Sequence, residues 1–206
     1  MRRSSILFIV VILMSVVACS SQETKAPAGQ PPQVARLEIH TFPSTTLTDQ
    51  EFLTGRKDGK PVTIAGELRL PRPGTDRFPA VILLHGSGGV KGNILDWEQD
   101  LNAMGVASFI FDGFTPRSIV TTSKDQSQLG RLAMIVDVYR ALGVLSKHPR
   151  IDPTRIALMG FSRGGQVALY ASMKRFQRLH SPVDQEIAAY IALYPLVTRP
   201  CARMKT

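Results

Sequence analysis

A serine stands between two glycines in the segment IALMGFSRGGQVALY, residues 156–170. An apolar run precedes Ser162 and a helical pattern follows it, so we expect a tight turn between a buried strand and a helix. Gly160 and Gly164 permit close packing around such a turn, which lifts the hydroxyl above the sheet edge at a helix N-terminus that favours negative charge. The pattern predicts that Ser162 is a nucleophile. The alternative is a serine that caps the helix.

A glycine-rich stretch, HGSGGV at residues 85–90, follows an earlier apolar run. We expect this loop at the C-terminal edge of the same parallel sheet as Ser162. Acyl transfer needs two backbone N–H groups for the developing oxyanion, and we predict that Ser87 and Arg163 supply them. The supporting residues are His85, Gly86, Gly88 and Gly89 of the loop and Gly160 and Gly164 of the serine turn.

Other binding chemistries fit the sequence less well. The HGSGG stretch could be a phosphate-binding loop, but it lacks the Gly-Lys-Ser/Thr of a P-loop and the spacing of a dinucleotide site. The net charge of +9 is spread along the chain without a basic run or a base-reading module, so we do not expect nucleic acid as a partner. No ligand cluster at metal-binding spacing is visible, and we expect no metal and no cofactor.

The elements that position these residues alternate along the chain, whose 206 residues suffice for one domain with a core. Two amphipathic strands are expected to pair antiparallel, with a turn signal at Asp58-Gly59 between them. Later apolar runs alternate with helical patterns, which predicts an α/β fold with an open, mainly parallel sheet and helices on both faces. The expected strands are 35–42, 62–71, 78–86, 106–114, 155–162 and 187–195, and the expected helices are 97–105, one with an apolar face from Leu129 to Leu142, and 163–179.

Four motifs taken together resemble the α/β-hydrolase superfamily and its dienelactone hydrolase-like branch: HGSGG (85–89), FDGFTPR (111–117), HPRIDPTRIALMGFSRGG (148–165) and YIALYP (190–195). The resemblance runs from about residue 62 to residue 195. It implies a hydrolase that cleaves carboxylic esters or lactones through an acyl-enzyme on Ser162. It also implies that His85 belongs to the oxyanion loop and is not the catalytic base.

Two charged residues follow a strand at the same edge of the expected sheet. Asp112 and Arg117 could contact a substrate, Arg117 through an acidic group, or they could orient their own loop as an ion pair. The sequence leaves both interpretations open.

The chain departs from the family after the serine. The family order is nucleophile, acid, histidine, yet only His180, Asp184 and Glu186 follow Ser162 as a histidine and carboxylates. A helix over residues 163–180 would carry them about 25 Å from the hydroxyl, so we expect all three at the surface. We expect a domain over residues 35–195 that lacks the last strands of the fold, with an irregular tail at 196–206.

Two functions are consistent with this departure. The first is a serine hydrolase whose activity is impaired because the triad acid and histidine are missing. The second is a non-catalytic binding module of the cell envelope, or an inactive fragment of a hydrolase. In either case the strand at 187–195 would leave an exposed sheet edge that can pair with another chain.

The N-terminal residues have the pattern of a secretion signal. An apolar segment at 6–17 follows two arginines and is too short to cross a bilayer as a helix, so residues 1–18 are interpreted as a signal peptide. The segment SVVACSSQ resembles the lipobox of bacterial lipoproteins, which implies lipidation of Cys19; an ordinary signal peptide with an incidental cysteine is the alternative. Residues 19–34 are polar and proline-rich, as in a flexible tether. We expect a membrane-anchored lipoprotein of the bacterial envelope that faces the periplasm or the exterior.

Overall fold

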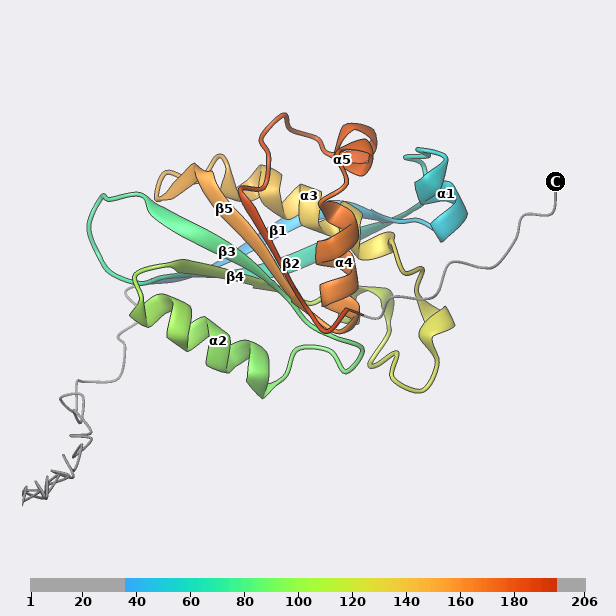
Figure 1. Ribbon diagram of the computed structural model, residues 1–206, viewed down its shortest axis with the longest axis horizontal. Coiled ribbons are helices and arrows are strands. Elements are labelled where there is room, and N and C mark those ends of the chain that lie inside the picture. Colours follow the sequence, from blue (N-terminus) through green and yellow to red (C-terminus); the bar gives the residue numbers. More distant parts are fainter. Residues whose placement is uncertain (1–35, 196–206) are drawn as a thin grey trace, which may run out of the picture. The chain divides into compact units, whose positions relative to one another are not determined.

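The computed structural model describes residues 36–195. The strands are β1 (Arg36–Thr46), β2 (Lys60–Leu70), β3 (Phe78–Leu84), β4 (Ala107–Phe111), β5 (Ile151–Phe161) and β6 (Ala189–Leu193). They form one sheet in the order β1-β2-β4-β3-β5-β6 (Figure 1). β2 is antiparallel to β1 and to β4, and the other neighbouring pairs are parallel. The expected mainly parallel sheet with an antiparallel first pair is therefore confirmed.

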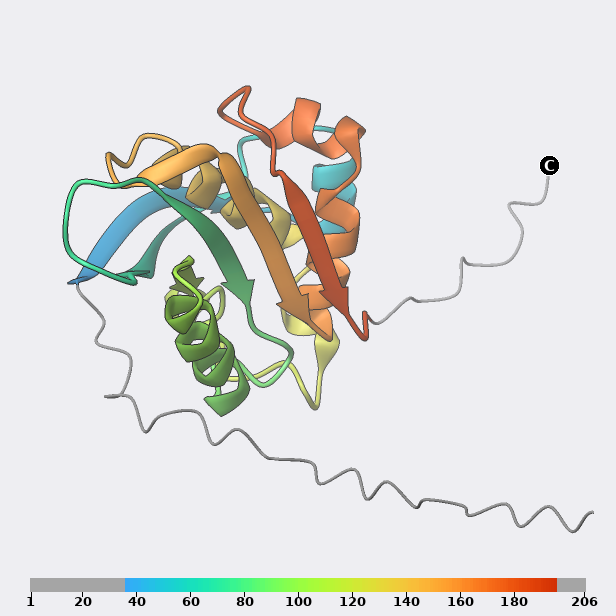
Figure 2. The same ribbon diagram turned by 60° about the vertical axis from the view of Figure 1, so that its left-hand side comes forward.

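Helices cover both faces of the sheet, as expected. The helices are α1 (Asp49–Leu53), α2 (Gly92–Ala103), α3 (Ala133–Leu145), α4 (Arg163–Ala171) and α5 (Lys174–His180), with the short 3-10 turns η1 (Thr115–Arg117) and η2 (Gln126–Gln128). α2 lies on one face, and α3 and α4 lie on the other (Figure 2). Ile82 of β3 packs in the core cluster of α3 and α4, whereas its neighbour Leu83 packs with Ile94 and Leu101 of α2. This alternation explains why β3 is apolar at successive positions.

A short helix, α1, lies in the connection that was expected to be only a turn. Its first turn is held by a capping box, in which the Glu51 amide donates to Thr48 Oγ1 at 3.2 Å and the Thr48 amide donates to Glu51 Oε2 at 2.9 Å. A threonine followed three residues later by a glutamate is a readable helix-start signal. The turn signal at Asp58-Gly59 lies at the other end of this connection and does not indicate the helix.

The helix expected over residues 163–179 is two helices, α4 and α5, separated at Ser172 and Met173. The chain therefore turns, and His180 comes back against α1. Its ring stacks on Phe52 with 4.1 Å between the ring centroids, and Nε2 lies 2.8 Å from the Phe52 carbonyl oxygen. The expectation that His180 lies at the surface is wrong, because the residue is only 6% exposed.

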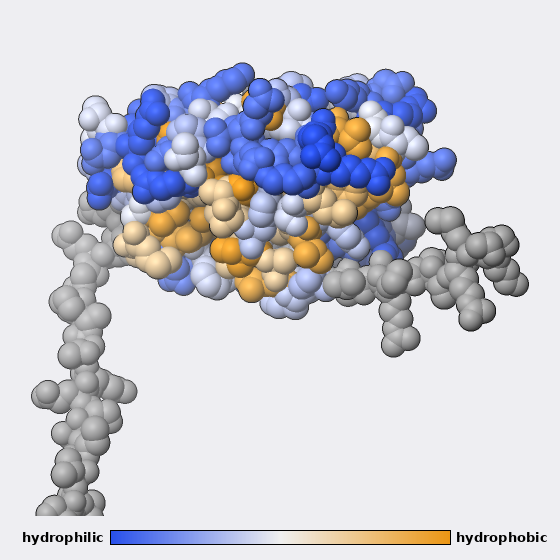
Figure 3. Space-filling model, turned by 45° about the horizontal axis from the view of Figure 1, so that its top comes forward, coloured by the Kyte–Doolittle hydropathy of each residue, from blue (hydrophilic) through white to orange (hydrophobic). Residues whose placement is uncertain are grey.

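Asp184 and Glu186 are exposed, as expected. β6 lies at an end of the sheet, where β5 is its one neighbour among the described strands. Hydrophobic side chains gather in a band across the face of the molecule seen in Figure 3.

Among residues 36–195, none of the helices has the length and apolar character that a membrane span needs. The expected signal peptide, Cys19, the tether and the tail at 196–206 lie outside the described residues.

Candidate active site

Ser162 has a backbone conformation that residues other than glycine rarely adopt. It lies between β5 and α4 with φ 53° and ψ −110°. Such a conformation costs roughly 1–3 kcal/mol and persists only where the surroundings hold it. Here the Ser162 amide donates to the Leu193 carbonyl of β6 at 3.0 Å, and the Ser162 carbonyl accepts from the Gln166 amide at 2.9 Å. The sheet and the helix thus fix the turn from both sides.

The two glycines around Ser162 are required by the close approach of backbone segments. A Cβ on Gly160 would lie 2.1 Å from the Gly164 carbonyl oxygen, and a Cβ on Gly164 would lie 2.5 Å from the Leu84 carbonyl oxygen. Neither position can hold a side chain without moving the backbone. The two glycines of the Gly-x-Ser-x-Gly pattern are therefore required by the close packing of α4 against β3 and β5.

The glycine-rich loop lies directly beside the serine. A Cβ on Gly86 would lie 3.4 Å from Ser162 Cβ and 3.1 Å from the Phe161 carbonyl oxygen. β3 and β5 are parallel neighbours with Leu84 opposite Gly160, so their carboxyl ends deliver both segments to one edge. The Gly89 amide donates to the Gly86 carbonyl at 3.1 Å and turns the loop back. The structure brings the two predicted segments together.

A side chain that the sequence analysis did not single out connects the two predicted oxyanion residues. Gln126 Nε2 donates to Ser87 Oγ at 2.8 Å, and Arg163 Nη1 donates to Gln126 Oε1 at 2.7 Å. The Thr122 amide also donates to the Ser87 carbonyl at 2.9 Å. Arg163, the first residue of α4, and the loop that carries Ser87 are therefore held to the segment around η2. No local pattern marks Gln126, because its partners come from distant parts of the chain.

His85 is buried beneath this loop, with 1% of its surface exposed. Its Nδ1 lies 2.8 Å from the Gly86 carbonyl oxygen, and its Nε2 accepts a hydrogen bond from the Gly113 amide at 3.2 Å. These contacts assign the proton to Nδ1, and burial lowers the pKa of His85, which keeps the ring neutral. Both nitrogens are engaged with the backbone, so the ring supports the loop.

Asp112 binds the turn that follows it. Its Oδ1 accepts from the amides of Phe114 at 2.7 Å and Thr115 at 3.2 Å, and its Oδ2 accepts from the Thr115 hydroxyl. Burial alone would raise the pKa of Asp112, but these hydrogen bonds outweigh it and the pKa lies below its usual value. The carboxylate therefore orients its own loop.

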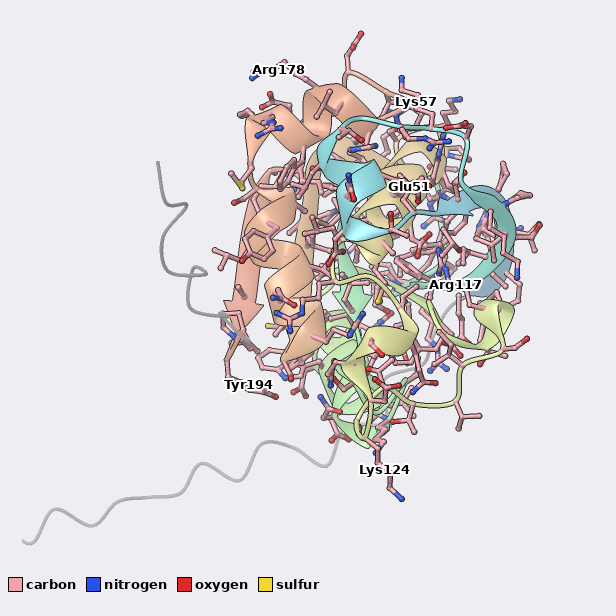
Figure 4. The ribbon with its side chains drawn as sticks, turned by 90° about the vertical axis from the view of Figure 1, so that its right-hand side faces the viewer. Glu51, Lys57, Arg117, Lys124, Arg178 and Tyr194 are labelled. Carbon is pink, nitrogen blue, oxygen red and sulfur yellow. The ribbon has the colours of Figure 1, made fainter. Side chains whose placement is uncertain are left out.

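Arg117 is not paired with Asp112. Its guanidinium forms a two-point ion pair with Asp137 of α3, with both N···O distances 2.9 Å, and it also donates to Thr46 Oγ1 and to the Gly113 carbonyl. The side chain is 4% exposed, and Figure 4 shows it on the side of β1 and β2, away from Tyr194 at the end of β6. These contacts favour the second of the two interpretations, that Arg117 orients its own loop, and they hold η1 to α3.

Each histidine within the described residues has a hydrogen-bond partner, and in no case is that partner Ser162. His85 contacts the oxyanion loop and His180 contacts Phe52. His40 and His148 both contact Glu38, near the amino end of β5. Within residues 36–195 the structure therefore places no histidine base beside the serine hydroxyl.

A parallel sheet with a strained serine turn beside a glycine-rich loop defines the α/β-hydrolase fold class. The comparison with protein families agrees with this assignment. A family model described as BD-FAE matches residues 67–194, and the chain belongs to this family.

Two curated relatives match most of this chain at low sequence identity. Thiohydrolase aneE of Aspergillus aculeatus is 27% identical over 154 residues, a match that covers 74% of this chain and 42% of the relative. Polyketide transferase ATR5 of Stachybotrys chlorohalonatus is 28% identical over 151 residues, with 73% and 45% covered. The chain thus spans less than half the length of these relatives.

Solved structures show the same fold. The esterase Est22 superposes with a TM-score of 0.52 at 22% identity, covering 81% of this chain and 47% of that structure. A structure described as a dienelactone hydrolase of Klebsiella pneumoniae superposes with a TM-score of 0.51 at 17% identity, covering 80% and 64%. The named relatives are thus a thiohydrolase and a polyketide transferase, and the structures of an esterase and a dienelactone hydrolase share the fold.

Proposed function

We propose that Ser162 is the nucleophile of a carboxylic ester or lactone hydrolase of the dienelactone hydrolase-like branch. The observation that carries this proposal is the strained Ser162 turn beside the glycine-rich loop, where a Cβ on Gly86 would lie 3.4 Å from Ser162 Cβ. In the first step the serine oxygen bonds to the carbonyl carbon, and the carbonyl oxygen becomes an oxyanion that accepts hydrogen bonds from the amides of Ser87 and Arg163. The carbonyl then re-forms as the bond to the alcohol oxygen breaks, and this oxygen takes up a proton equivalent to the one that the serine lost. Water cleaves the serine ester by the same steps, which releases the acid and restores the serine hydroxyl.

This chain by itself is proposed to be an impaired catalyst. The serine proton must go to a base, and the described residues place no imidazole beside Ser162. Oxyanion stabilisation and binding without the base leave a residual acceleration of about 10³–10⁴ over water. Acylation of Ser162 should therefore be slow.

The test uses a fluorophosphonate probe and a chromogenic short-chain ester on the purified full chain. We expect slow covalent labelling that mass spectrometry locates at Ser162, lost in Ser162→Ala and kept in the control Ser172→Ala, whose hydroxyl is exposed at the end of α4. Labelling elsewhere, or no adduct at all, would contradict the nucleophile. Rapid stoichiometric labelling with ester turnover would contradict the impairment.

A second candidate function is a binding module without turnover. It is favoured by the same lack of a base among the described residues, together with the exposed edge of β6, where Ile191 is 40% and Tyr194 is 68% exposed. A monodisperse chain that binds an ester without cleaving it, and whose binding is unchanged in Ser162→Ala, would support this function. Insoluble protein would argue against it.

We also propose that the mature protein is a lipoprotein of the bacterial envelope, anchored through Cys19. The proposal rests on the short apolar segment and the SVVACSSQ motif. Expression in a bacterium with a radioactive fatty acid should label the wild type and leave Cys19→Ala unlabelled. A labelled Cys19→Ala chain would contradict it.

A further inference from the structure

Three metal-ligating side chains converge at the amino edge of the parallel sheet, away from Ser162. Nε2 of His40 and Nε2 of His148 each lie 3.0 Å from the same oxygen, Oε2 of Glu38. The two imidazole rings are nearly perpendicular, with 5.5 Å between their centroids. One ligand atom from each of the three residues lies within 4.8 Å of the others.

The elements that carry these residues fix their directions. Glu38 and His40 are two residues apart on β1, so both side chains lie on the same face of the sheet. His148 belongs to the connection between α3 and β5 and reaches the same point from 110 residues away. The side chains of Glu38, His40 and His148 are 17%, 25% and 9% exposed. The cluster is thus held by its surroundings and still open to solvent.

We propose that Glu38, His40 and His148 bind one divalent transition-metal ion of the zinc class. Two imidazoles and a carboxylate are ligands that zinc prefers, whereas magnesium and calcium prefer oxygen alone. Ligands of a tetrahedral zinc ion are about 3.4 Å apart at the usual bond lengths, so each 3.0 Å contact needs to open by roughly 0.4 Å. Water would complete the coordination.

Metal binding has a defined proton balance at His148. The Arg150 amide donates to Nδ1 of His148 at 3.2 Å, so without metal the ring proton lies on Nε2 and points to Glu38. Coordination through Nε2 moves that proton to Nδ1, where it faces the Arg150 N–H and displaces this hydrogen bond. The Arg150 amide should therefore report on binding. Arg36, whose Nε lies 2.9 Å from Glu38 Oε1, is the cation that competes with the metal.

The proposed ion would not take part in acyl transfer. His148 precedes β5 and Ser162 follows it. The neighbouring strand β3 runs from Phe78, opposite Ile151, to Leu84, opposite Gly160, and its seven residues span roughly 20 Å. The ion would instead join β1, at an end of the sheet, to the connection between α3 and β5. The consequence is added stability of the folded state, because a ligand that binds only the folded chain stabilises it.

The experiment titrates the purified full chain, stripped of metal and without a histidine tag, with Zn²⁺ by calorimetry and with Co²⁺ by visible absorption. We expect one ion per chain, a four-coordinate Co²⁺ spectrum without a thiolate charge-transfer band, and a shift of the Arg150 amide resonance. At Zn²⁺ 100-fold above the dissociation constant the melting temperature should rise by about 5–10 °C.

Matched variants locate the site. His40→Gln and His148→Gln keep an amide that can donate to Glu38, and each should weaken Zn²⁺ binding by about 100-fold or more, beyond the effect of a group that only orients a ligand. The exposed Glu186→Gln is the control and should bind like the wild type. Arg36→Gln, at a side chain 69% exposed, should tighten binding several-fold without affecting the fold.

The proposal is overturned if the wild type binds no ion in a one-to-one complex, if both glutamine variants bind as tightly as the wild type, or if Arg36→Gln weakens binding. The three residues would then be a hydrogen-bonded ion cluster only. These readouts are independent of the chemistry proposed for Ser162.

Discussion

Ser162 lies on a strained backbone in contact with glycines that cannot carry a side chain. The strain is local, with φ 53° at a residue that is not glycine, while its support comes from β6 and from the first turn of α4. The turn places Ser162 at the carboxyl end of β5, directly before α4. This arrangement suits a nucleophile, because a fixed backbone limits the positions that its side-chain oxygen can take.

The strain predicts that removing the side chain stabilises the protein. Ser162→Gly should raise the free energy of unfolding by about 1 kcal/mol, since glycine adopts positive φ without the steric cost. Ser162→Ala keeps the Cβ and should gain less. Urea denaturation of the three proteins measures the difference, and a destabilised glycine variant would show that the turn is not strained.

Connections between elements are made by buried charged residues. Arg117 of η1 pairs with Asp137 of α3, and Ser44 of β1 also donates to Asp137. Under α2, Glu98 is 1% exposed, with Oε1 3.1 Å from Nε of Arg69 on β2. The pair of Arg117 and Asp137 fixes the loop that carries Asp112. The pair of Glu98 and Arg69 lies between α2 and the sheet.

Breaking the ion pair between Arg117 and Asp137 should strongly lower the free energy of unfolding. Asp137→Asn leaves the Arg117 guanidinium buried without its counter-charge, and we expect a loss of about 3–5 kcal/mol in the free energy of unfolding. The control is Glu186→Gln, which breaks an exposed pair with Lys174 and should cost less than about 1 kcal/mol. Equal effects of the two substitutions on urea unfolding would contradict the role given to Asp137.

Glu98 should make stability depend on pH. Burial raises the pKa of Glu98 above its ordinary value of 4.5, so the folded state binds its proton more tightly than the unfolded state. By linkage, this contribution is full below pH 4.5 and is lost as the pH rises through the raised pKa of the folded state. Glu98→Gln should remove the decline in unfolding free energy, measured between pH 4 and about 8, while Glu186→Gln retains it. A wild-type decline in Glu98→Gln would exclude this carboxyl as the cause.

At the scale of the whole described part of the chain, residues 36–195, helices cover both faces of the sheet and β6 lies at one edge. Ile191 of β6 is 40% exposed, and a hydrophobic band crosses one face (Figure 3). An apolar edge strand offers unpaired backbone groups to another chain. We therefore propose that this polypeptide self-associates through β6 in solution.

A charge placed on that edge should reduce association. Ile191→Lys should increase the monomer fraction in light scattering coupled to size exclusion, because lysine on an edge strand opposes pairing. Val120→Lys, in a loop and at a residue 87% exposed, adds the same charge elsewhere and should have no such effect. If both variants behave alike, net charge rather than the edge controls association.

The order of elements and the serine turn were predictable because their signals are local. Apolar runs and helical periodicity extend over neighbouring residues, and parallel strands bring their carboxyl ends to one edge. That rule predicted Gly86 beside Ser162 from positions far apart in the sequence, and in the structure a Cβ on Gly86 would touch Ser162 Cβ. The start of α1 was also readable from Thr48 and Glu51.

The sequence by itself determined the fold class, the shared sheet edge of Ser162 and the glycine-rich loop, and the turn that carries Ser162. Only the tertiary structure decided that Arg117 pairs with Asp137, that His180 stacks on Phe52, and that His148 meets Glu38 and His40. These contacts join segments whose separation leaves no periodic mark in the chain. They depend on where α4 breaks and how α3 crosses β1, which is fixed by the packing of the whole core.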